Sequence, residues 1–242
     1  MARITLEHVS HRFGEREVLR DVDVELVERR IGLIGANGSG KSTLARLLNG
    51  LVVPTSGRVR VDGLDTRRHG AQVRRRVGFV FTDPDAQIVM PTVAEDVAFS
   101  LRRSPLTRDE RATRVTAALA RVDLDGHADH PAHLLSGGQK QLLAITSVLV
   151  TDPDVLICDE PTTLLDARNT RRVAAVLAGL EQQVIVVTHH LELLETFDRV
   201  LVVDEGRVVC DDRPAAALAA YRGIVGDATS AGTATGAGDA TC

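Results

Sequence analysis

One glycine-rich stretch of this sequence has the residue types that hold a chain of phosphates. Its members are Gly35, Ala36, Asn37, Gly38, Ser39, Gly40, Lys41 and Ser42, with Thr43 directly after them. Glycines let the backbone curl until successive N–H groups point inward at phosphate oxygens. Lys41 supplies a mobile charge for the β- and γ-phosphates, and the Ser42 hydroxyl is a ligand for Mg²⁺. The stretch therefore predicts a binding site for a nucleoside triphosphate and Mg²⁺.

The segments on either side are the ones that such a phosphate loop needs. Arg30–Gly35 is short and apolar and ends in glycine, which is typical of a buried strand that enters a tight turn. Helical spacing follows in Leu44, Leu47, Leu48 and Leu51. That helix adds the positive end of its dipole to the phosphate site. The alternative is a glycine-rich turn that caps a helix and binds nothing, and this context disfavours it.

A second stretch, far downstream, offers another anion site. Ser136, Gly137, Gly138 and Gln139 precede a long helical run, Lys140–Val150. Ser136 can cap that helix, and the two glycines leave its N-terminal amides open. The sequence contains no Asn-Lys-x-Asp string that would read guanine. The combination of the two stretches resembles the nucleotide-binding subunits of ABC transporters, and the resemblance covers about Arg3–Tyr221.

The resemblance implies an α/β fold, that of a P-loop NTPase of the ABC ATPase type. Such a fold has an N-terminal antiparallel β region and a helical subdomain, here about residues 92–150. In that family the Ser-Gly-Gly-Gln signature of one subunit closes on the γ-phosphate held by the phosphate loop of another. Two ATP molecules are then sandwiched in a head-to-tail dimer. A second ATPase subunit, identical or paralogous, is the expected partner, and an isolated monomer is expected to hydrolyse ATP poorly.

The resemblance also assigns the hydrolytic residues. Val155–Glu160 matches the family's pattern of four apolar residues followed by two carboxylates. In this pattern Asp159 orients the Mg²⁺ ion and Glu160 polarises the attacking water as general base. His189 follows the predicted strand Val184–Val187 and matches the switch histidine that senses the γ-phosphate. His190 stands where the family usually has Asp, and the sequence gives no interpretation of that difference.

Three further residues are assigned in the same way. Asp166 matches the residue that contacts the opposite subunit, and Phe13 stands where an aromatic ring stacks on adenine. Thr82 replaces the family's glutamine that bridges Mg²⁺ and the membrane subunit. We expect the Thr82 hydroxyl to act on the metal through a bridging water. Gln87, the alternative, is expected on the surface that faces the membrane partner.

The subtype follows from the segments Phe81–Gln87 and Met90–Val97, which are similar to the ATPases of energy-coupling-factor importers. Those importers carry vitamins, cobalt or nickel, and they combine two ATPase subunits with a transmembrane coupling protein and a small substrate-capturing membrane protein. Asp159–Val173 looks most like the ATPase of the biotin module. The alternatives are a cobalt or nickel importer and a non-transport ABC ATPase. A non-transport ABC ATPase of one kind has a long coiled coil between the phosphate loop and the signature, and Lys41 to Ser136 leaves no room for it. Another kind has two ATPase domains in one chain.

Composition limits the other classes of function. The 29 Lys and Arg residues against 33 Asp and Glu residues give a net charge of −4, which argues against a nucleic-acid partner. The longest apolar run, Leu142–Val150, is far shorter than the roughly 20 residues of a membrane span. We therefore expect a soluble subunit that lies peripherally on the cytoplasmic face of the membrane. Cys158, Cys210 and Cys242 show no CxxC spacing and are expected to be free thiols.

The remaining elements can be placed from periodicity. Arg3–Val9 and Val22–Val27 alternate apolar and polar residues as half-buried strands do. Thr92 and Thr107 each precede a Glu by three residues, which is the capping box that starts a helix, so a helical insertion is expected from Thr92. The ATPase domain is expected to cover residues 1–222. Residues 223–242 have few large apolar side chains and are expected to be a disordered tail.

Overall fold

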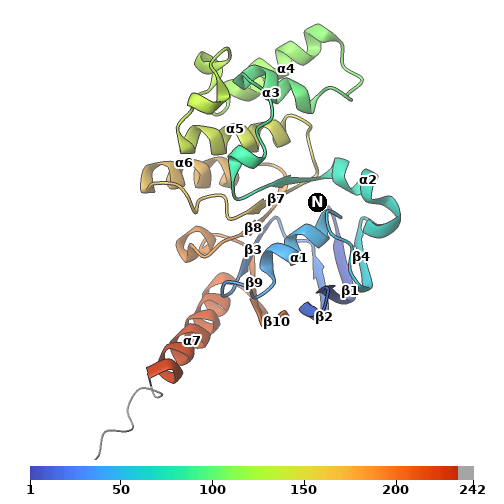
Figure 1. Cartoon of the computed structure of the whole chain (residues 1–242), viewed down its shortest axis with the longest axis vertical. Helices are drawn as coiled ribbons and strands as arrows, with labels where there is room; N and C mark the ends of the chain where they lie inside the picture. The colour runs from blue at the N-terminus through green and yellow to red at the C-terminus, as the bar shows by residue number, and fades with distance from the viewer. Residues whose placement is uncertain (234–242) are drawn as a thin grey trace, which may run out of the picture.

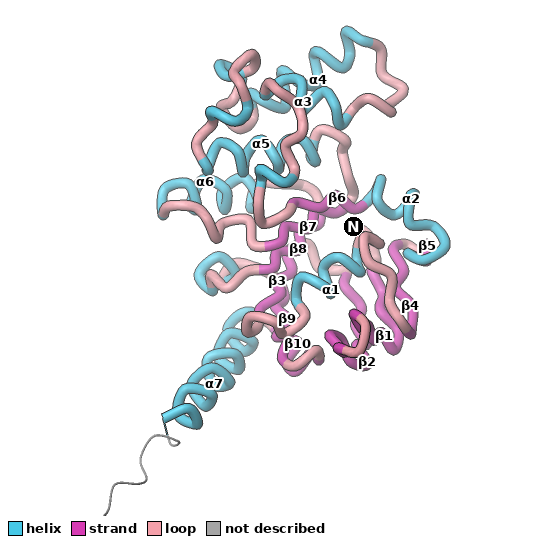
Figure 2. The backbone as a smooth tube through the Cα atoms, in the orientation of Figure 1, coloured by secondary structure: helices cyan, strands magenta, loops and turns pink. Residues whose placement is uncertain are grey.

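A six-stranded sheet forms the centre of the molecule in this computed structural model, which describes the backbone of residues 1–233 and the side chains of residues 1–226. The strand order is β10-β9-β3-β8-β7-β6, and only the β9–β10 pair is antiparallel. The strands are β3 (Arg30–Ile34), β6 (Val77–Val80), β7 (Val155–Asp159), β8 (Gln183–Val187), β9 (Arg199–Asp204) and β10 (Arg207–Asp212). Figures 1 and 2 show how the helices and a second sheet surround it.

The parallel strands are apolar because both faces of the sheet are buried. In β3, Ile31 and Leu33 pack into the core that the sheet shares with the antiparallel sheet, whereas Ile34 packs on the opposite side. Because β3, β7 and β8 run in parallel, their carboxyl ends meet at one edge. The segments that leave those ends carry the phosphate loop, the Asp159–Glu160 pair and His189. Such an edge is where α/β sheets bind ligands.

The N-terminal part of the chain forms an antiparallel sheet of order β2-β1-β4-β5, as expected. Its strands are β1 (Ile4–Phe13), β2 (Arg16–Leu26), β4 (Ser56–Val61) and β5 (Leu64–Asp65). Buried and exposed residues alternate along β1, so that Ile4 and Leu6 enter the core. Helix α1 (Lys41–Leu48) buries Leu44, Leu47 and Leu48 in the same core, between the two sheets.

Consecutive helices lie between β6 and β7 and gather at one end of the molecule (Figure 1). They are α3 (Val93–Ser100), α4 (Arg108–Ala120) and α5 (Gly137–Leu149). Each begins with a complete capping box, formed by Thr92 and Glu95, Thr107 and Glu110, and Ser136 and Gln139. The other helices are α2 (Thr66–Arg76), α6 (Ala167–Ala178) and α7 (Pro214–Thr233), and short 3₁₀ turns are η1 (Pro84–Ala86), η2 (Asp125–His127), η3 (Ala132–Leu134) and η4 (Leu191–Leu194).

The C-terminal segment differs from the prediction of a disordered tail from residue 223. Helix α7 continues without a break to Thr233. The segment is rich in alanine, the strongest helix former, and Ile224 packs with Tyr221 against the main core. Residues 234–242 of the predicted tail, including Cys242, lie outside the described residues.

Candidate functional site

The phosphate loop joins β3 to α1 and is shaped by close contacts with neighbouring backbone. A Cβ atom on Gly35 would lie 1.9 Å from the carbonyl oxygen of Val203, and one on Gly40 would lie 2.7 Å from that of Val18. Gly40 also has a φ of 108°, which disfavours any other residue. The loop is therefore fixed between β2 and β9, and Ala36, Asn37 and Gly38 remain exposed at its tip.

Lys41 is folded back over this loop. Its Nζ donates to the carbonyl oxygens of Gly35 and Ala36, at 2.8 Å in each case. Burial lowers the pKa of Lys41, and the carboxylates of Glu160 and Asp159 oppose that shift. An ammonium group has three protons, so one remains for an anion at the loop. Lys41 thus stands ready to contact a phosphate from within the loop.

Asp159 ends β7 and faces the start of α1. Its Oδ1 accepts from the Ser42 hydroxyl at 2.8 Å, and Nη2 of Arg46 lies 3.4 Å from its Oδ2. The side chain is only 1% exposed, and burial raises its pKa. A buried carboxylate beside a hydroxyl is a set of hard oxygen donors, which suits Mg²⁺. The residues present therefore fit the ion that the sequence predicted here, with Thr43 half-buried in the next position of the helix.

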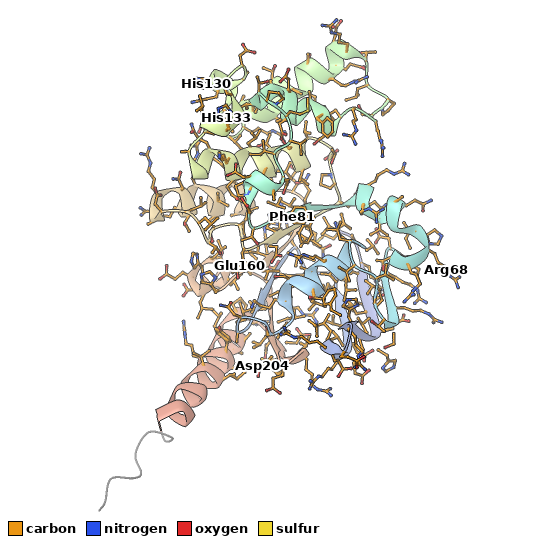
Figure 3. All side chains as sticks on the ribbon, viewed as in Figure 1. Arg68, Phe81, His130, His133, Glu160 and Asp204 are labelled. Atoms are coloured by element: carbon orange, nitrogen blue, oxygen red, sulfur yellow. The ribbon has the colours of Figure 1, made fainter. Side chains whose placement is uncertain are left out.

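Glu160 and His189 meet at the same edge of the sheet. Nδ1 of His189 lies 2.9 Å from Oε2 of Glu160, and the Thr163 hydroxyl donates to that oxygen at 2.8 Å. The Glu160 N–H donates to the Val187 carbonyl at 2.8 Å, which joins the end of β7 to β8. Glu160 has a φ of 54°, an uncommon conformation for a non-glycine residue that turns its side chain out of the strand. Figure 3 labels Glu160 beside these strands.

His190 acquires a structural explanation that the sequence did not give. Its Nδ1 lies 3.0 Å from the hydroxyl of Thr162, which is buried in the loop after β7. The His190 ring also meets the His189 ring edge to face, with 4.4 Å between centroids. His190 therefore connects the loop after β7 to the loop after β8, and it packs on the predicted switch histidine.

The signature residues lie apart from this edge. Ser136 caps α5, and its N–H donates to Oε1 of Gln139 at 2.9 Å. Gly138 packs so closely on α6 that a Cβ there would lie 2.3 Å from the Asn169 side chain. Asp166 caps α6 by accepting from the N–H of Asn169 at 2.7 Å. Among the described residues, no hydrogen bond or ion pair joins these signature residues to the phosphate loop.

Phe13 and Thr82 have different surroundings. Phe13 is 55% exposed, and its ring meets the His11 ring in a T-shaped contact with 4.6 Å between centroids. Thr82 lines a hollow of about 130 Å³ together with Gly137 and Pro161, and it has no hydrogen bond to Ser42 or Asp159. The metal role of Thr82 stays a prediction.

Gln87, which the sequence predicted on the surface that faces the membrane partner, is half-buried, and its amide is bonded at both ends. Its Oε1 accepts from the N–H of Phe81 at 3.0 Å, and its Nε2 donates to the Ala144 carbonyl at 3.1 Å. Gln87 thus joins the two ends of the Phe81–Gln87 segment and connects the segment to α5. Both partners are backbone atoms, which leave no trace in a sequence motif.

Sequence reasoning also missed Arg46 and Thr163, which contact Asp159 and Glu160. Arg46 stands four residues after Ser42 on α1, so helical spacing places both on one face. Thr163 stands three residues after Glu160 in a turn. The spacing of Ser42 and Arg46 was a usable signal, whereas the turn that brings Thr163 back was not.

Comparisons with known proteins point to one family. The family described as ABC transporter matches residues 19–163, which is more than half of the chain. An ABC transporter ATP-binding protein of Deinococcus radiodurans is 57% identical over 219 residues, which are 90% of this chain and 97% of that protein. The biotin transport ATP-binding protein BioM of Rhizobium etli is 47% identical over 221 residues, 91% of this chain and 98% of that protein. Relatives named for cobalt import and for energy-coupling factor transport also match.

Solved structures match over the same extent. The structure of cbiO1 from Clostridium perfringens, part of the ABC transporter complex cbiONQ, has a TM-score of 0.80 and 32% identity and covers 93% of each chain. In the part of this chain that the structure describes, no helix has the length and apolar character to cross a bilayer. From its phosphate loop, its carboxylate pair and these matches, the chain belongs to the ATP-hydrolysing subunits of the ABC transporter family.

Proposed function

We propose that this chain binds Mg²⁺ and ATP and hydrolyses ATP to power an importer of the energy-coupling-factor type. The observation that carries the proposal is the meeting of Lys41, Ser42, Asp159, Glu160 and His189 around one edge of the sheet. Each has the chemistry that phosphoryl transfer to water requires. Relatives named for biotin, cobalt and energy-coupling factor transport support the importer assignment.

In the proposed reaction, the phosphate loop and Lys41 orient the β- and γ-phosphates through N–H groups and a positive charge. Ser42 and Asp159 would hold Mg²⁺, which neutralises charge on the phosphates. Glu160 accepts a proton from the attacking water as general base. Its Oε1 is available for this, because the hydrogen bonds from Thr163 and His189 both involve Oε2. His189 contacts the γ-phosphate from its place beside Glu160, and Phe13 stacks on the adenine.

The signature acts on ATP bound to a second subunit in this proposal. Ser136 and Gly137 are exposed at the start of α5, and their partners lie within α5 and its neighbours rather than in the phosphate loop. A helix N-terminus stabilises a terminal phosphate wherever the helix comes from. Asp166 lies beside Gly138 through Asn169, so it would reach the same interface. The second subunit is another copy of this chain or a paralogue.

The membrane partners we propose are a transmembrane coupling protein and a small substrate-capturing protein, with this subunit peripheral on the cytoplasmic face. The hollow beside Thr82 and the exposed Val89, two residues after the Phe81–Gln87 segment, offer a docking place for the coupling protein. Biotin is the proposed cargo, on the support of the biotin-named relatives. Cobalt or nickel is the second candidate, supported by the relative named for cobalt import.

The experiment is to purify the chain with its membrane partners from the native host, reconstitute the complex in vesicles and measure ATP-dependent uptake. Uptake of labelled biotin, but not of Co²⁺ or Ni²⁺, is the expected result. Uptake of a metal ion would transfer the assignment to the second candidate. A native complex that contains this chain but no membrane protein would contradict the transport assignment itself.

A further inference from the structure

His127, outside the motifs, contacts the signature directly. It ends η2, and its Nε2 lies 3.3 Å from Nε2 of Gln139. The other end of the Gln139 amide is already committed, because its Oε1 accepts from the Ser136 N–H at 2.9 Å. An amide NH₂ group can only donate. The His127 Nε2 must therefore accept, so the ring is neutral and carries its proton on Nδ1.

Other protonation states of the ring are incompatible with this arrangement. A ring protonated on Nε2, alone or as the cation, would place an N–H against the NH₂ of Gln139. Turning the Gln139 amide over would relieve that contact but would place its NH₂ against the N–H of Ser136. In the required tautomer the Nδ1–H is buried without a hydrogen-bond partner among the described residues, so the contact with Gln139 is the one hydrogen bond that fixes the tautomer of the ring. One tautomer of His127 and one orientation of the Gln139 amide satisfy both ends of that amide together.

The loop that carries His127 is itself fixed. Arg172 of α6 donates to the Val122 carbonyl and forms an ion pair with Asp123 at 2.9 Å. The His127 ring packs against that of His130, with 5.3 Å between centroids. Figure 3 places His130 and His133 close together in this part of the molecule. The Nε2 atom is thus presented to Gln139 by a braced loop rather than by a free side chain.

We infer that His127 is a positioning residue for the signature. As a neutral acceptor it fixes the Gln139 amide, which keeps Oε1 of Gln139 on the Ser136 N–H and maintains the first turn of α5. That turn carries the N–H groups and the Ser136 hydroxyl that meet the ATP of the second subunit. His127 touches no nucleotide. This inference rests on the proposed role of the signature, although its structural part stands independently.

The structural part is tested by nuclear magnetic resonance on the full chain labelled with ¹⁵N-histidine. The His127 signal is assigned by its loss in His127→Gln. We expect a neutral ring with the proton on Nδ1 and a lone pair on Nε2 at neutral pH. A cationic ring, or a proton on Nε2, would overturn the inference whatever the activity of the protein.

The functional part uses the Glu160→Gln background, in which ATP-bound dimers should accumulate. His127→Phe keeps a flat ring and removes the acceptor, whereas His127→Gln offers an amide oxygen near the Nε2 position. His127→Asn has the shorter amide, which reaches only the Nδ1 position. His133→Phe is the matched control, because exposed His133 has no hydrogen bond or ring contact with a described residue. The readout is ATP-dependent association, measured by sedimentation.

The Phe and Asn variants should need about 2- to 10-fold more protein for half-maximal association, the range expected for one hydrogen bond. His127→Gln and His133→Phe should match the parent. Equal association of the Gln and Asn variants would overturn the inference, and that comparison decides even where His127→Phe fails to fold. If the Glu160→Gln parent does not associate with ATP, the proposed dimer fails instead, and the resonance experiment still tests the state of His127.

Discussion

Nδ1 of His189 and Oε2 of Glu160 lie 2.9 Å apart, so the proposed base and the proposed phosphate sensor are already partners. The Thr163 hydroxyl donates to the same carboxylate oxygen at 2.8 Å. These contacts orient the carboxylate before any nucleotide arrives. Oε1 has no hydrogen-bond partner among the described residues, which leaves it for the water that the reaction consumes.

Lys41→Ala should weaken ATP binding, because it removes the ammonium group that the phosphate loop aims at the phosphates. A charged hydrogen bond lost here corresponds to about 10- to 100-fold in the dissociation constant. Calorimetric titration of the isolated chain measures it. Lys140→Ala is the control, since Lys140 pairs with Asp85 away from the loop. Unchanged ATP affinity in Lys41→Ala would contradict the assignment of the phosphate site.

Gln87→Ala should destabilise the fold by about 1–3 kcal/mol, because the Phe81 N–H and the Ala144 carbonyl lose their partner. Urea denaturation gives the free energy of unfolding, and Gln72→Ala on the exposed face of α2 is the control.

Thr82→Val should leave the free energy of unfolding unchanged. If it also leaves ATPase activity at limiting Mg²⁺ unchanged, the Thr82 hydroxyl has no metal role.

His11 should make the fold less stable in acid. Burial lowers the pKa of the His11 ring below its ordinary value of 6.5, while a contact with the Val53 backbone opposes the shift. The unfolded chain then binds a proton at a pH where the folded chain does not. Stability contributed by the neutral ring is present above pH 6.5 and is lost as the pH falls through 6.5 toward the folded value.

The measurement is the free energy of unfolding of the parent and of His11→Leu at several pH values from about 7.5 to about 5. This interval spans the ordinary histidine pKa of about 6.5. The parent should lose stability toward acid more steeply than the variant. Parallel curves for the two proteins would show that His11 does not titrate differently on folding.

A chain that stops after Arg222 should be less stable than one that stops after Gly226, because the shorter chain loses Ile224 from the core. Partial burial of one isoleucine contributes about 1 kcal/mol, which corresponds to roughly 2–4 °C in melting temperature for a domain of this size. Scanning calorimetry compares the two. Equal melting temperatures would show that the extended part of α7 contributes nothing to the fold.

Local patterns were sufficient to predict the elements that position the site. The buried strands β3, β7 and β8 are continuous apolar runs, and the capping boxes of α3 and α4 are visible as Thr and Glu three residues apart. The phosphate loop is recognisable because glycine, lysine and serine occur at fixed spacing. These features are determined by neighbours in the chain.

The contacts that the sequence did not reveal join residues far apart, or join a side chain to backbone. Arg46 meets Asp159 across the interface of α1 and β7, and Gln87 bonds two backbone groups. His127 meets Gln139 twelve residues along the chain, and Arg172 of α6 holds the segment just before His127 by binding Val122 and Asp123. The extent of α7 was missed because its alanine-rich end has few large apolar groups, although Ile224 supplies one.

The rate of ATP hydrolysis by Glu160→Gln in the complete transport complex tests the role of Glu160 as general base most directly. Glutamine keeps the size of the side chain and can still meet Thr163 and His189, but it cannot take a proton from water. Single-turnover hydrolysis should slow by about 10²- to 10⁴-fold, while ATP affinity stays near that of the parent. A variant that hydrolyses ATP at the parent rate would show that Glu160 is not the base.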